Sequence, residues 1–129
     1  MNATHRLGIW MDHATAHLIE LATEPGEMKT IESKFSHHEK EHSLNHSENV
    51  MHNKEQHEQA AYYKQLSQAI RNYEEVLLFG PTTAKEELAN LLKADHHFAK
   101  IKVDVKHADK MSTNQQQAFV KEHFFKALN

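Results

Sequence analysis

The chain has 129 residues, of which 39% are hydrophobic and 26% are charged, so it predicts one globular domain with a single core over residues 1–129. It contains no cysteine, which excludes disulfides, thiolate metal ligands and a cysteine nucleophile. The formal charge is −3 with 13 neutral histidines, which is not the strongly basic balance of a dedicated nucleic-acid-binding protein.

The sequence predicts neither a secretion signal nor a membrane-spanning segment. Its first eight residues lack an apolar core of signal-peptide length, and no window approaches the roughly 20 apolar residues that a spanning helix needs. We therefore expect a cytoplasmic protein that does not contact a membrane. Because histidine titrates near about pH 6.5, mild acid is expected to turn this acidic protein basic.

The first third of the chain predicts three β-strands. Arg6–Met11 is short, apolar and β-prone, and Asp12 follows it as a turn residue. Residues 14–21 alternate between apolar and polar side chains, which indicates an antiparallel hairpin with the first strand. Residues 28–35 alternate again but are mostly polar, so we predict a third strand at a sheet edge that could pair with a second copy as a homodimer.

Residues 36–56 break the apolar pattern, since Leu44, Val50 and Met51 are their only aliphatic side chains. We predict a His-rich polar loop with no more than frayed helical turns. Helical periodicity begins near His57, with an apolar stripe at Ala60, Tyr63, Leu66, Ala69, Ile70 and Tyr73.

The second half alternates between strands and helices. Glu75–Gly80 (EVLLFG) is an apolar run typical of a buried central strand. Thr83 with Glu86 predicts a capping box for the next helix, and Ser112 with Gln115 predicts another for the last one. The expected inner face of the first of these helices consists of Ala84, Leu88, Leu91 and Leu92. Between these helices, Ile101, Val103 and Val105 alternate with polar residues as a half-buried strand.

The order strand, strand, strand, loop, helix, strand, helix, strand, helix predicts an α/β fold. The later alternation requires parallel strands joined by right-handed crossovers, whereas the first three strands form an antiparallel meander. The fold is therefore a mixed sheet with helices packed on it.

The histidines of the predicted loop are the main candidates for chemistry. His38, His42 and His46 are four residues apart, so they would share one face of a helix. Imidazole is a good ligand for zinc and nickel, which makes a metal-binding protein one hypothesis. The alternative is a solvated polar loop in which the spacing is coincidental.

Three further patterns point to chemistry less strongly. His38 to His42 (HEKEH) matches the zinc-protease pattern, but polar residues flank it and the extension found in metzincins is missing. The segment after Gly80 (PTTAK) joins a strand to a helix and could bind an anion, although a tight turn explains it better. Asp12 and Asp104 lack the partner carboxylates of a ribonuclease-H-like nuclease. We therefore predict no enzyme activity.

Three segments carry a resemblance to known proteins: residues 7–21 (LGIWMDHATAHLIEL), 75–92 (EVLLFGPTTAKEELANLL) and 103–124 (VDVKHADKMSTNQQQAFVKEHF). They resemble small stand-alone bacterial proteins labelled translational machinery proteins. These in turn are similar to the middle domain of eukaryotic and archaeal peptide-chain release factor 1 and of Pelota. The resemblance implies a ribonuclease-H-like three-layer domain, with a five-stranded mixed sheet in the order 3-2-1-4-5 and about three helices.

The resemblance also implies where a functional loop would lie. Release factors carry Gly-Gly-Gln between the third strand and the long helix, and here residues 35–57 occupy that place. This segment contains Gln56 but no glycine, so peptidyl-tRNA hydrolysis is not expected.

We therefore predict a non-enzymatic module that binds the ribosome or structured RNA and needs no cofactor. The loop would contact phosphates best when its histidines are protonated. The predicted contact residues are Lys34, His37, His38, Lys40, His42, His46, Lys54 and His57.

Overall fold

The computed structural model of the chain describes residues 5–21, 28–33 and 48–128. The strands are β1 (Arg6–Met11), β2 (Thr15–Leu21), β3 (Lys29–Glu32), β4 (Glu75–Gly80) and β5 (Lys102–His107). The helices are α2 (Glu48–Ile70), α3 (Ala84–Ala94) and α4 (Thr113–Leu128), with a short 3₁₀ turn, η2, at His96–Phe98. The predicted order of strands and helices is confirmed, and η2 is the addition to it.

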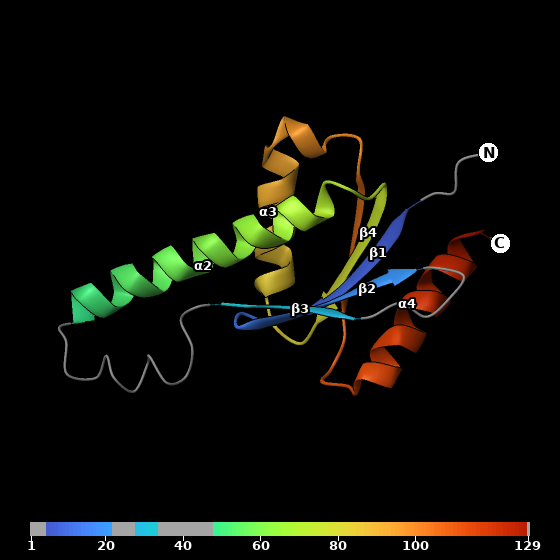
Figure 1. Ribbon diagram of the computed structural model, residues 1–129, viewed down its shortest axis with the longest axis horizontal. Helices are drawn as coiled ribbons and strands as arrows, with labels where there is room; N and C mark the ends of the chain where they lie inside the picture. Colours follow the sequence, from blue (N-terminus) through green and yellow to red (C-terminus); the bar gives the residue numbers. More distant parts are fainter. Residues whose placement is uncertain (1–4, 22–27, 34–47, 129) are drawn as a thin grey trace.

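The strands form one mixed sheet in the order β3-β2-β1-β4-β5, as predicted. β1 pairs antiparallel with β2 and parallel with β4, so Ile9 lies opposite Leu18 on one side and Leu78 on the other. β4 pairs parallel with β5, and β2 pairs antiparallel with β3. The hairpin and the parallel half thus meet at β1, in the middle of the sheet (Figure 1).

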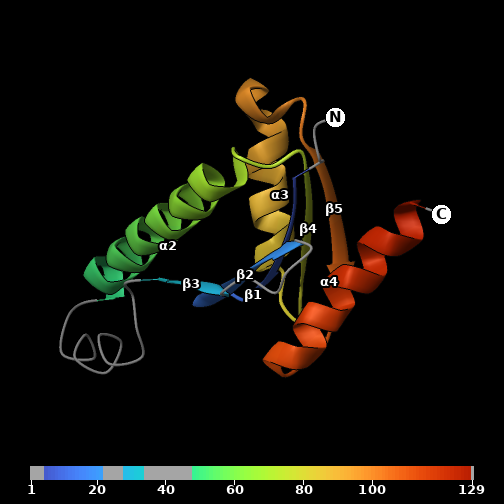
Figure 2. The same cartoon turned by 45° about the vertical axis from the view of Figure 1, so that its right-hand side comes forward.

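Side-chain alternation along the strands divides the apolar residues between two faces. Leu7, Ile9 and Met11 of β1 belong to the core under α2 and α3. Trp10 belongs with Leu77, Phe79, Val120 and Phe124 to the core under α4. Figure 2 shows α2 and α3 on one side of the sheet and α4 on the other. The domain therefore has the predicted three layers.

Gly80 ends β4 where the chain must turn sharply into α3. Its φ is +150°, a backbone conformation that side chains with a Cβ rarely adopt. A Cβ placed there would also lie 2.1 Å from the carbonyl oxygen of Met11. Glycine is therefore required at this position, and it lets the carboxyl ends of β1 and β4 lie side by side.

Some sequence predictions about the elements are wrong in detail. β3 spans Lys29–Glu32 within the longer segment predicted for it. Leu91, predicted on the inner face of α3, is 51% exposed. Thr83 does not cap α3 with its side chain, and its hydroxyl donates to Glu87 instead. By contrast, the capping box between Ser112 and Gln115 is present, with bonds of 2.9 and 3.2 Å.

The predicted core residues on α2 are mostly buried. Tyr63, Leu66 and Ile70 contribute to the core under α2 and α3, but Ala60 is exposed. Tyr62 was not on the predicted stripe, yet it is only 2% exposed. Within the described residues, no helix has the length and apolar character needed to cross a bilayer.

Candidate functional site

Most of the predicted contact residues lie outside the described residues. These are Lys34, His37, His38, Lys40, His42 and His46. The histidine triplet of the metal hypothesis and the HEKEH pattern are among them, so neither is tested. The other two predicted contact residues, Lys54 and His57, lie on α2.

Helix α2 begins at Glu48, well before the predicted start near His57, so the second part of the predicted loop is helical. The segment 48–56 has no apolar stripe, which is why periodicity missed it. It also has no glycine or proline, and its glutamate, glutamine, lysine and methionine residues have good helix propensity. The predicted loop at 36–56 is thus corrected at its C-terminal end.

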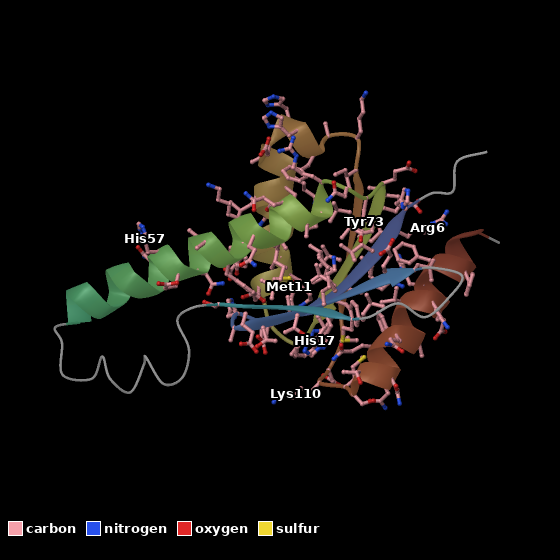
Figure 3. The ribbon with its side chains drawn as sticks, in the orientation of Figure 1. Arg6, Met11, His17, His57, Tyr73 and Lys110 are labelled. Carbon is pink, nitrogen blue, oxygen red and sulfur yellow. The ribbon has the colours of Figure 1, made fainter. Side chains whose placement is uncertain are left out.

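The N-terminal half of α2 extends beyond the edge of the sheet (Figure 1). His57 is exposed on this half, and Figure 3 shows it pointing away from the sheet. The first buried side chain in the described part of the helix is Tyr62, and the helix packs on the core from there to Ile70. The extended half is therefore a surface that a partner could contact.

The charge of the extended half depends on its histidines. Residues 48–61 contain three glutamates, one lysine and two histidines. With neutral histidines this surface is acidic and would repel phosphate. Two positive charges on the histidines would bring the formal charge of this segment from −2 to zero.

A polar cluster ties α2 to the body of the domain at the carboxyl ends of β1 and β4. Its centre is the carboxylate of Glu87 on α3. Oε1 accepts a hydrogen bond of 2.8 Å from the hydroxyl of Tyr63 on α2. Oε2 lies 3.1 Å from Nε2 of His13 in the β1–β2 turn and 3.1 Å from the hydroxyl of Thr83. We call these four residues the Glu87 cluster.

The electrostatics of the Glu87 cluster favour a structural role. Partial burial acts to raise the pKa of Glu87, but hydrogen bonds from His13, Tyr63 and Thr83 outweigh it and lower that pKa below its ordinary value. Burial and the bond to Glu87 raise the pKa of the Tyr63 hydroxyl. The carboxylate is therefore ionised and the hydroxyl neutral at pH 7, which suits a fixed hydrogen bond rather than proton transfer.

A second tyrosine fixes α2 to the same edge. The hydroxyl of Tyr62 donates to the carbonyl oxygen of Asp12 at 3.0 Å, and burial raises its pKa. The carboxylate of Asp12 accepts bonds of 2.8 and 2.7 Å from the amides of Ala14 and Thr15. Asp12 is therefore a turn residue, as predicted.

In the strand-to-helix turn after Gly80, hydrogen-bond donors of the segment bond to oxygen atoms of the same segment. The amide of Ala84 bonds to the hydroxyl of Thr82 at 3.2 Å. The buried side chain of Lys85 donates to the carbonyl oxygen of Thr82. The amides of Glu86 and Glu87 bond to the carbonyl oxygen of Thr83. Because these donors are bonded within the segment itself, the interpretation as a tight turn is favoured and the one as an anion-binding site is not.

Sequence reasoning missed the Glu87 cluster because Tyr63 and His13 are 24 and 74 residues from Glu87 along the chain, and only Thr83 is close to it in sequence. No local spacing marks such a group. Sequence reasoning also missed a group that follows α3, in which the ligating atoms of Asp95, His96 and His97 lie close together. That group did carry a signal, since the three residues are consecutive.

The fold of this chain is similar to that of solved structures of other proteins. No protein-family model and no curated protein sequence matches the chain. The crystal structure of Thermoplasma acidophilum Pelota matches 92% of the chain, with a TM-score of 0.59 and 16% identity. The chain has the fold of part of Pelota. Archaeoglobus fulgidus Pelota matches 95% of the chain, with a TM-score of 0.60 and 10% identity.

The match to Pelota is one of architecture. The chain spans 32% of the length of each of these two Pelota chains. The predicted resemblance to Pelota, which shares this fold with the middle domain of release factor 1, is confirmed at the level of the fold. The resemblance to stand-alone bacterial proteins stays a prediction.

Proposed function

We propose that this chain is a non-enzymatic, translation-related module that binds the ribosome or structured RNA in the cytoplasm. The observation that carries the proposal is the likeness to Pelota over more than nine tenths of the chain. The absence of glycine from residues 35–57 supports a binding role rather than peptidyl-tRNA hydrolysis.

The extended half of α2 and the segment before it form the proposed contact surface. In release factors the functional loop enters the long helix at this place, and here the helix extends outward with His57 exposed. His52 and Lys54 lie on the same half of the helix. Together with the histidines at 37, 38, 42 and 46, they give a surface whose affinity for phosphate rises as histidine is protonated.

Co-sedimentation with ribosomes over a series of salt concentrations and pH values tests the proposal. We expect association at pH 6 and low salt that weakens at pH 7.5. Replacement of His52 and His57 by glutamine should reduce the salt slope at pH 6 by up to about one unit per histidine. The matched control replaces His96 on η2 and His107 at the end of β5, two exposed histidines outside α2, and should leave the slope unchanged.

Absence of association at pH 6 and low salt would overturn the proposal. So would equal losses from the test and control variants, since binding would then follow net charge rather than this surface.

The alternative function is zinc or nickel binding through His38, His42 and His46. Metal titration of the chelator-treated protein distinguishes the two, because replacing these three histidines by alanine should weaken metal binding only under the alternative.

A further inference from the structure

The turn between α3 and β5 brings three metal-ligating side chains together. Asp95 follows the last residue of α3, and His96 and His97 begin η2. One ligating atom from each of the three residues lies within 4.8 Å of the others. Among the residues that the structure describes, this is the group of three that meets that condition.

The distances within the group are close to those of a metal site. Oδ1 of Asp95 and Nδ1 of His97 are 2.7 Å apart. Neighbouring ligands around an ion with bonds of about 2.1 Å are separated by roughly 3.0–3.4 Å. The imidazole rings of His96 and His97 have centroids 4.2 Å apart at an interplanar angle of 31°. The three ligating atoms, which lie within 4.8 Å of one another, are thus close enough to share one ion.

The backbone holds the turn in place on both sides. The carboxylate of Asp95 accepts a 3.0 Å bond from the amide of His97. The amide of Asp95 bonds to the carbonyl oxygen of Leu92, and the amide of Phe98 bonds to that of Asp95. Leu92 and Phe98 are both buried in the core under α2 and α3. The ligands are thus carried on a fixed segment, which reduces the entropy lost on binding.

The three side chains are accessible to solvent. The side chain of His97 is 57% exposed and that of Asp95 is 44% exposed, while His96 is exposed as a residue. An ion held here would keep open positions for water or another ligand. Two imidazoles and one carboxylate suit borderline divalent ions such as zinc, nickel and copper.

We propose that Asp95, His96 and His97 form a surface site for a divalent transition-metal ion. This site uses none of the histidines of the His-rich segment, and it does not depend on the proposed ribosome contact. Metal binding at Nδ1 of His97 replaces the hydrogen bond between that atom and Oδ1 of Asp95, and the proton of the neutral ring then lies on Nε2. Copper should bind most tightly, because divalent copper stands at the top of the Irving–Williams order.

Paramagnetic copper tests the site in the full-length chain, because nuclear magnetic resonance separates it from the His-rich segment. Substoichiometric Cu²⁺ should broaden the backbone amide signals of residues 92–101. The variants Asp95→Asn and His96→Gln/His97→Gln should keep those signals sharp at the same metal concentration. His107→Gln is the control, because His107 lies 3.5 Å from Asp109 and the described residues place no third ligand beside this pair.

Zinc titration by calorimetry gives the second readout. It uses chains in which His38, His42 and His46 are already glutamine, so that these loop histidines do not compete. In that background, His96→Gln/His97→Gln should weaken zinc binding about tenfold or more. Unchanged broadening in the variants, or broadening at residues 92–101 no greater than at 107–109, would overturn the site. Equal zinc affinity with and without His96 and His97 would do the same.

Discussion

Gly8 sets how closely α4 can approach the sheet. It lies in β1 on the face that α4 covers, directly under Val120. A Cβ at Gly8 would lie 2.2 and 2.8 Å from the two γ-carbons of Val120. Val120 is fully buried, so it has no free space into which to move.

We predict that Gly8→Ala destabilises the domain. The added methyl group forces α4 or β1 to shift, and such overpacking costs about 1–3 kcal/mol of the free energy of unfolding. Urea denaturation followed by circular dichroism measures the change. Val120→Ala in the same chain removes both clashing carbons, so the double variant should lose less stability than the sum of the two single variants. An unchanged urea midpoint for Gly8→Ala would contradict this packing.

At the scale of elements, the Glu87 cluster joins α2, α3 and the β1–β2 turn. Glu87 and Tyr63 connect the two helices, and His13 adds the hairpin. The folded state lowers the pKa of Glu87 relative to its ordinary value of 4.5. The ionised carboxylate therefore stabilises the fold above that value, and this stabilisation is lost as the pH falls through the lower native pKa.

We predict that Glu87→Gln destabilises the domain at pH 7 and that the difference from wild type disappears in acid. Because the Glu87 side chain is 47% exposed, the difference at pH 7 should not exceed about 1 kcal/mol after solvent screening. Urea midpoints measured between pH 7 and pH 3 test the effect. Glu86→Gln, an exposed neighbour on the same helix turn, is the matched control. A difference that persists unchanged below pH 4 would refute the electrostatic account.

At the scale of the whole molecule, the sheet has two edge strands whose unpaired backbone groups are open to pairing with another chain. β3 forms one edge, with four residues paired to β2, and β5 forms the other, with six residues. β5 exposes Lys102 and Lys106, and Val105 between them is 37% exposed. Exposed lysines on an edge strand oppose pairing with a second sheet, because like charges would meet.

We predict that Lys102→Val/Lys106→Val makes the protein self-associate through β5. Sedimentation velocity over a range of protein concentrations measures the effect. Lys64→Val/Lys93→Val removes the same charge from exposed helical positions and should leave the association state unchanged. If the β5 variant sediments like the wild type at every concentration, the lysines do not protect this edge. Homodimer formation through β3 stays a prediction.

Local patterns in the sequence predicted the elements and their order. Short apolar runs located β1 and β4, and side-chain alternation located β2, β3 and β5. Asp12 and Ser112 marked a turn and a cap through hydrogen bonds that span three residues or fewer. These patterns can be recognised in the sequence because the residues that form each hydrogen bond are close together along the chain. The resemblance then supplied the strand order, which the structure confirms.

The tertiary structure decided what depends on distant residues. Apolar periodicity reveals a helix only where another element covers one of its faces, so it missed the extended half of α2. Periodicity also placed Leu91 on the inner face of α3, although its side chain is exposed. It also could not show that Glu87 meets Tyr63 and His13, since the sheet brings them together. The sequence by itself therefore determined most of the elements through local spacing, and the order of the strands through the resemblance. Only the packed structure decided which polar side chains converge, because folding alone makes those residues neighbours.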